Sequence, residues 1–131
     1  MKFLHSMIRV KNIEESLNFY QNFIGLKLIE KKSLEDCDLY FFGEDENSCQ
    51  IELTYNYETP ENGYDNGSAF GHFAFGVDNM NDVTAKLNDL GYEYLWEPFE
   101  LELKDEKGIF SKKLIAFVKD PDGNEIELIQ G

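Results

Sequence analysis

The feature that most constrains this chain is an internal repeat, in which two segments carry the same order of patterns. The first opens with HSMIRV at residues 5–10 and the second with HFAFGV at residues 72–77, so that a valine follows each histidine by five positions. After each opening comes an amphipathic stretch with an asparagine suited to capping its start and a glycine just beyond its end. Such self-similarity predicts one structural unit used twice.

Each unit is predicted to contain one helix and four strands. The two helices are expected after Asn12 and after Asn79, and they should end at Gly25 and Gly91. Besides the two openings, strands are expected at residues 26–32, 38–42, 50–55, 92–96, 113–118 and 125–129. The order is therefore β-α-β-β-β, twice.

One such unit has too few strands to cover both its helix and the inner face of its sheet. We therefore expect a single α+β domain over residues 1–131, built from two βαβββ modules at about 1–57 and 68–131. The two sheets should form one curved half-barrel with the helices outside. Its concave inner face is a place where pockets are favoured.

The charge of the chain narrows the choice of partners. The 26 Asp and Glu residues outnumber the 12 Lys and Arg residues, which gives a formal net charge of −14. Such a surface repels phosphate backbones and anionic lipids, so neither nucleic acid nor a membrane is expected as a partner. With no apolar run of roughly 18 residues and no signal-peptide pattern, a cytoplasmic protein with free thiols at Cys37 and Cys49 is expected.

The only two histidines occupy equivalent positions in the repeat. Because side chains alternate along a strand, His5 and His72 should face the concave side, as should Glu52 and Glu127 near the ends of their modules. Taken alone, each of these residues is more often structural than functional. Four equivalent positions together favour an N₂O₂ site for a divalent ion such as Ni, Co, Fe, Mn or Zn.

Two further polar residues extend the predicted site. Arg9, the only arginine, shares a strand face with His5, where it either pairs with a nearby acid or holds a substrate carboxylate. Asn56 follows Glu52 on the same face, and its amide either binds substrate or forms a turn.

These residues belong to motifs that resemble the glyoxalase I (lactoylglutathione lyase) family of the vicinal-oxygen-chelate superfamily. The motifs are HSMIRV at 5–10, SLNFY at 16–20, IELTYN at 51–56, GHFA at 71–74 and DPDGNEIEL at 120–128. The resemblance implies a metal site at His5, Glu52, His72 and Glu127, with nickel or cobalt favoured and zinc possible. It also implies that Arg9, Asn56 and His72 bind substrate.

The activity implied by the resemblance is the isomerisation of the methylglyoxal–glutathione hemithioacetal to S-D-lactoylglutathione through an enediolate. Glu127 is the expected base, and Glu52 the base for the opposite stereoisomer. Residues 99–113 read as a long charged loop, and Lys107 within it is left outside the predicted site.

Other functions remain open on the sequence. One alternative is another enzyme of the same superfamily, such as an acyl-CoA epimerase or a thiol-adding resistance enzyme. The other is a protein of the same fold that sequesters a small molecule. An iron dioxygenase is disfavoured, because a fourth ligand at Glu52 exceeds its usual ligand triad. A homodimer is expected, and the linker at 56–68 permits a site within one chain or across two.

Overall fold

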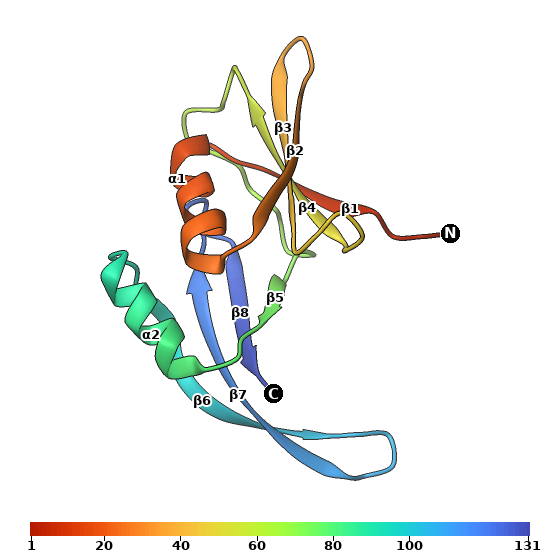
Figure 1. Cartoon of the computed structure of the whole chain (residues 1–131), viewed down its shortest axis with the longest axis vertical. Helices are drawn as coiled ribbons and strands as arrows, with labels where there is room; N and C mark the ends of the chain where they lie inside the picture. The colour runs from red at the N-terminus through yellow and green to blue at the C-terminus, as the bar shows by residue number, and fades with distance from the viewer. The chain divides into compact units, whose positions relative to one another are not determined.

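The computed structural model describes all 131 residues and divides into two compact units, Met1–Gly67 and Ser68–Gly131. The first unit contains β1 (His5–Arg9), α1 (Ile13–Leu17), η1 (Asn18–Ile24), β2 (Lys27–Ser33), β3 (Cys37–Gly43) and β4 (Gln50–Asn56). The second contains β5 (His72–Gly76), α2 (Met80–Asp89), β6 (Tyr94–Lys104), β7 (Phe110–Lys119) and β8 (Glu125–Gln130) (Figure 1). None of the helices combines the length and apolar character needed to cross a bilayer.

Each unit forms one four-stranded sheet with the same connectivity. The strand order is β1-β4-β3-β2 in the first unit and β5-β8-β7-β6 in the second. In both sheets the first and last strands of the unit are parallel neighbours, and the other pairs are antiparallel. The predicted α+β class and the repeated βαβββ order are therefore confirmed.

The sheet of the first unit has one apolar face and one polar face. Ile8, Tyr40, Phe42 and Leu53 are buried on the apolar face, and the helical segment η1 contributes three buried aromatic side chains to the core of the unit. Because side chains alternate along each strand, the polar side chains of β1 and β4 lie on the opposite face. The candidate site is built on that face.

The first helix begins as expected but does not continue as an α-helix. The side chain of Asn12 accepts a hydrogen bond from the amide of Glu15 at 3.1 Å, and Gly25 ends the segment with φ at 86°. Between them, Asn18–Ile24 form a π-helix. Phe19, Tyr20 and Phe23 are all buried in this segment. The periodicity of the apolar residues does not distinguish a π-helix from an α-helix.

The expectation of a loop at residues 99–113 was wrong. Strand β6 extends to Lys104 and β7 begins at Phe110, so most of this stretch is a β-hairpin. Asp105 closes its turn by accepting hydrogen bonds from the amides of Lys107 and Ile109, and Gly108 supplies a φ of 81°. In the second half of β6, apolar residues alternate with acidic ones, which is typical of a strand with one exposed face. The high charge of this stretch favoured the prediction of a loop instead.

The cap of α2 provides a test of the second unit. Asn79 accepts hydrogen bonds from the amides of Asn81 and Asp82, at 2.9 and 3.2 Å. We expect Asn79→Ala to lower the free energy of unfolding by about 1 kcal/mol, because both amides lose their acceptor. Denaturant titration would measure this, with Asn79→Asp as the control that keeps a cap. Equal stability of the Ala and Asp variants would contradict the cap's contribution.

The two cysteines are free, as expected, and differ in their surroundings. Burial raises the pKa of the Cys37 thiol, and the neighbouring Asp36 carboxylate adds to this effect, whereas Cys49 is exposed. In the native protein at pH 8 we expect a disulfide reagent such as Ellman's to modify one thiol per chain rapidly. The second should react only in denaturant, and rapid reaction of both would contradict this prediction.

Candidate metal and substrate site

The first half of the candidate site is a histidine–glutamate pair across two parallel strands. His5 on β1 pairs in register with Gln50 on β4, and Met7 pairs with Glu52. Glu52 therefore lies two residues beyond the position directly opposite His5, on the same face of the sheet. The His5 Nε2 atom is 3.4 Å from Glu52 Oε1. The His5 ring also meets the Phe41 ring edge-on, with centroids 5.4 Å apart.

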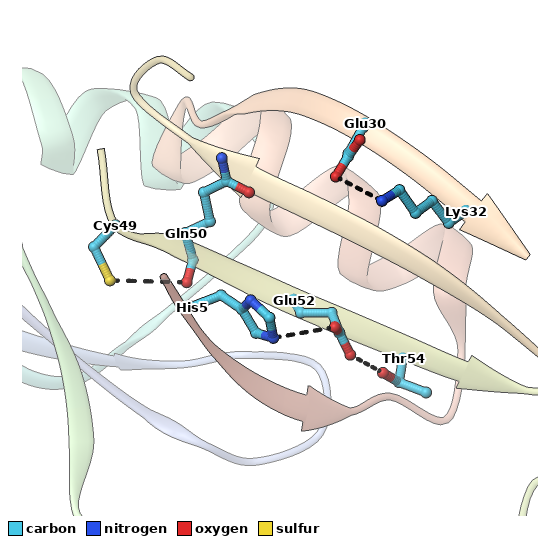
Figure 2. A network of polar contacts seen from close by, with 7 residues as sticks. All are labelled: His5, Glu30, Lys32, Cys49, Gln50, Glu52 and Thr54. Atoms are coloured by element: carbon cyan, nitrogen blue, oxygen red, sulfur yellow. Dashed lines mark hydrogen bonds and ion pairs between the residues drawn. The ribbon is translucent and has the colours of Figure 1, made fainter. Parts of the chain in front are cut away.

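The second oxygen of Glu52 has a partner of its own. Thr54, the next residue on the same face of β4, donates a hydrogen bond from Oγ1 to Glu52 Oε2 at 2.7 Å (Figure 2). Only 11% of the Glu52 side chain is exposed. This carboxylate is therefore held at both oxygens, one by a hydroxyl and the other facing an imidazole.

The second unit repeats this arrangement. His72 pairs in register with Glu125 and Ala74 with Glu127, which gives Glu127 the same offset from its histidine. His72 Nε2 is 2.7 Å from Glu127 Oε2, and the His72 ring meets Phe117 edge-on at 5.5 Å. Exposure also matches, since both histidine side chains are 40% exposed and the Glu127 side chain is 14% exposed.

One difference separates the two carboxylates. The position two residues beyond Glu127 on β8 is Ile129, whose side chain cannot donate a hydrogen bond. Glu127 therefore lacks the counterpart of the bond by which Thr54 holds Glu52. The two pairs thus share their register and differ in their contacts: Glu52 accepts a hydrogen bond from Thr54, whereas Glu127 lies closer to its histidine.

Each pair has the spacing that a shared metal ion requires. Two ligand atoms about 2.1 Å from one ion and at right angles to each other lie roughly 3 Å apart, and the observed separations of 3.4 and 2.7 Å bracket that value. Imidazole nitrogen and carboxylate oxygen are also donors that borderline divalent ions accept. Neither unit adds a third His, Cys, Asp or Glu side chain to its pair. The structure thus joins the four expected ligands as two pairs, and the four-ligand centre stays a prediction.

The other predicted residues lie on the same face of the first sheet, toward the ends of the strands. Arg9 is exposed at the end of β1, and Asn56 is half-buried at the end of β4. Asn56 Nδ2 donates a hydrogen bond to the hydroxyl of Tyr64 at 3.0 Å. Tyr64 lies in the linker at 56–68, and its contact with Asn56 was not predicted. Lys107 lies in the β6–β7 turn.

A cavity beside His5 was also missed. It has a volume of about 310 Å³, and its lining includes Glu30 and Lys32 from β2 together with Phe41. Nothing in the repeat pattern marked the two charged residues, because the motifs of the site lie on β1, β4, β5 and β8. Their positions depend on how β2 pairs with β3.

Comparison with known proteins places this geometry in a family. The model of the Glyoxalase/Bleomycin resistance protein/Dioxygenase superfamily matches residues 2–128. The chain is 37% identical to the lactoylglutathione lyase of Neisseria meningitidis serogroup A, over 99% of this chain and 91% of that protein. It is 36% identical to the lactoylglutathione lyase of Salmonella typhimurium, over 99% of this chain and 93% of that protein.

Solved structures agree with the sequence relatives. The trypanothione-dependent glyoxalase I of Leishmania major has a TM-score of 0.75 and 32% identity, covering 99% of this chain and 86% of that one. Glyoxalase I from Zea mays has a TM-score of 0.79 and 31% identity, covering 99% of this chain and 44% of the longer maize chain. Since sequence and structure agree along nearly its whole length, the chain belongs to the Glyoxalase/Bleomycin resistance protein/Dioxygenase superfamily.

Proposed function

We propose that this protein is a metal-dependent lactoylglutathione lyase that isomerises the hemithioacetal of methylglyoxal and glutathione to S-D-lactoylglutathione. The observation that carries the proposal is the pair of equivalent His–Glu contacts, each at the same register position of its sheet. Relatives that carry the name lactoylglutathione lyase match over nearly the full chain, which supports the same assignment. The reaction removes a toxic 2-oxoaldehyde from the cell.

The proposed metal site consists of His5, Glu52, His72 and Glu127, which would together hold one divalent ion. This N₂O₂ set suits nickel or cobalt and also accepts zinc. When bound, the ion supplies Lewis acidity that stabilises negative charge on the two neighbouring oxygens of the substrate. We further propose a cytoplasmic homodimer in which each chain is a single domain.

Glu127 is the proposed catalytic base. It removes the proton from C1 of the hemithioacetal and returns it to C2, while the thioether bond to glutathione stays intact. The hydrogen bond from Thr54 restrains Glu52, whereas Ile129 leaves Glu127 without such a restraint. A carboxylate that must accept a proton is a better base without a hydroxyl already bonded to it, which supports Glu127 as the main base.

The thiol part of the substrate is assigned to the far ends of β1 and β4. Arg9 offers a guanidinium to a peptide carboxylate, and the Asn56 amide adds hydrogen bonds beside it. His72 would contact the substrate from the second unit. Glutathione is the proposed thiol, because the sequence relatives carry its name, whereas the Leishmania major glyoxalase I is described as trypanothione-dependent.

The direct test is an assay of metal-stripped protein with methylglyoxal and glutathione. We expect turnover, seen as a rise in thioester absorbance, only after addition of Ni²⁺ or Co²⁺, with Zn²⁺ less effective. Calorimetry should show one tightly bound ion per site, and His5→Ala or His72→Ala should weaken its binding. Metal binding without turnover would favour a protein that sequesters a small molecule. Repeating the assay with trypanothione in place of glutathione would test which thiol the protein uses.

Replacement of the base separates its role from that of the other acids. We expect Glu127→Gln to lower kcat at least about 10³-fold, because an amide cannot accept the C1 proton. Glu125→Gln, two residues earlier on β8, is the matched control and should keep kcat within about twofold of the wild-type value. Near-normal activity of Glu127→Gln, with metal content verified, would refute the assignment of the base.

A further inference from the structure

The far ends of β1 and β4 carry polar side chains that have no counterpart in the second unit. Arg9 pairs in register with Thr54, and Asn56 follows Thr54 by two residues on the same face of the sheet. At the equivalent positions the second unit has Gly76 and Gly131, neither of which has a side chain. The fold therefore does not require a guanidinium or an amide at this place.

Both of these side chains keep polar atoms available for a ligand. Arg9 is exposed, and none of the ion pairs in its unit includes it. Asn56 is half-buried, and its side chain forms one hydrogen bond, from Nδ2 to the hydroxyl of Tyr64. Its Oδ1 atom and its second Nδ2 hydrogen are not used within the chain. Of the two roles expected for Arg9, the absence of an ion pair favours the binding of a substrate carboxylate.

The segment that follows β4 is folded back by contacts that do not involve the Tyr64 hydroxyl. Thr59 donates a hydrogen bond from Oγ1 to the backbone carbonyl of Asn56 at 2.8 Å. The amide of Gly63 donates to the carbonyl of Pro60 at 2.9 Å, and Gly63 has a φ of 77°, which completes a tight turn. Because other groups form these bonds, the course of the chain up to Tyr64 does not depend on the phenol hydroxyl.

The contact of this hydroxyl is with a side chain that nothing else in the unit holds. The backbone of Asn56 is fixed, because it pairs with Cys37 in the sheet. Its side-chain amide is different, since the last torsion of an asparagine is broad and leaves the amide free to rotate. The hydrogen bond of 3.0 Å to Tyr64 holds one edge of that amide. The atoms that remain free are then directed away from Tyr64.

We propose that Tyr64 is a positioning residue for the thiol part of the substrate, which acts by holding the Asn56 amide ready for the peptide of glutathione. This inference rests on the proposed function, which assigns Arg9 and Asn56 to that peptide. A peptide offers both N–H and C=O groups, and an amide held at one edge presents an acceptor and a donor to them. An amide that is already oriented loses less conformational freedom when the ligand binds.

The position of this contact predicts an effect on binding and not on the chemical step. At about 3.3 Å per residue, Arg9 lies roughly 13 Å along β1 from His5, the nearer proposed metal ligand of that strand. A contact so far from the reacting carbon atoms is equally strong in the bound substrate and in the transition state. Losing it should therefore raise KM and leave kcat unchanged.

The test removes the hydroxyl in Tyr64→Phe and measures binding and turnover separately. S-methylglutathione carries the peptide but cannot react, and calorimetry with Ni²⁺-loaded protein gives its Kd. We expect Tyr64→Phe to raise this Kd about fivefold, the effect of one neutral hydrogen bond. In the assay with methylglyoxal and glutathione, KM should rise by a similar factor while kcat stays within about twofold of the wild-type value.

A double-mutant cycle distinguishes positioning from a direct contact with the ligand. Asn56→Ala should weaken binding of S-methylglutathione, and adding Tyr64→Phe to it should have no further effect, because the hydroxyl then has no amide to hold. Tyr57→Phe is the matched control, since it removes a phenol hydroxyl from the same segment. That hydroxyl donates to Asp38 at 2.7 Å, and Asp38 pairs with Tyr55 and so faces away from Asn56. The control should leave the Kd unchanged.

Each outcome has a defined meaning. Equal Kd values for Tyr64→Phe and the wild type would overturn the inference, as would an equal loss in Tyr57→Phe or a loss that persists in full in the Asn56→Ala background. In these cases turnover by the wild type leaves the proposed function intact. A wild type that neither binds S-methylglutathione nor converts the hemithioacetal would overturn the proposed function, and the inference with it. Thermal unfolding of each variant confirms that the comparison is made on folded protein.

Discussion

The parallel pairing of the first and last strands in each unit is the constraint on which the candidate site depends. It brings a histidine near the start of the unit beside a glutamate near its end, although 47 residues separate His5 from Glu52 and 55 separate His72 from Glu127. The same register also places an aromatic ring, Phe41 or Phe117, against each imidazole. A slip of one residue would send the glutamate into the apolar core, so burial of the opposite face protects the site's geometry.

The two units keep this geometry and differ in its surroundings. Thr54 restrains one carboxylate and Ile129 leaves the other without that bond. The charged pair of Glu30 and Lys32 in one unit is replaced by Trp96 and Phe99 in the other. The repeat thus supplies two His–Glu pairs of one kind, and the residues around the two pairs have diverged.

Most of the strands and both His–Glu pairs could be predicted from the sequence. The alternation of side chains along a strand and the correspondence between the two repeats can both be read directly from the order of the residues. These two patterns sufficed to pair His5 with Glu52 and His72 with Glu127. The cavity could not be predicted, since a bulge between Leu28 and Glu30 moves Glu30 to the face that plain alternation would not give it. The π-helix and the long hairpin were likewise decided by packing and cross-strand pairing, which one-dimensional periodicity does not report.

The parallel pairing of the first and last strands in each unit also has a consequence for how the protein folds. The histidine and the glutamate of each unit meet only when its first and last strands pair, which closes a segment of more than forty residues. Pairing over such a distance in the sequence is entropically costly and slow. The hairpins between the antiparallel strands require far shorter loops and can form beforehand. In each unit the histidine and the glutamate should therefore meet late in folding, so that a nascent or partly unfolded chain presents them only as isolated side chains.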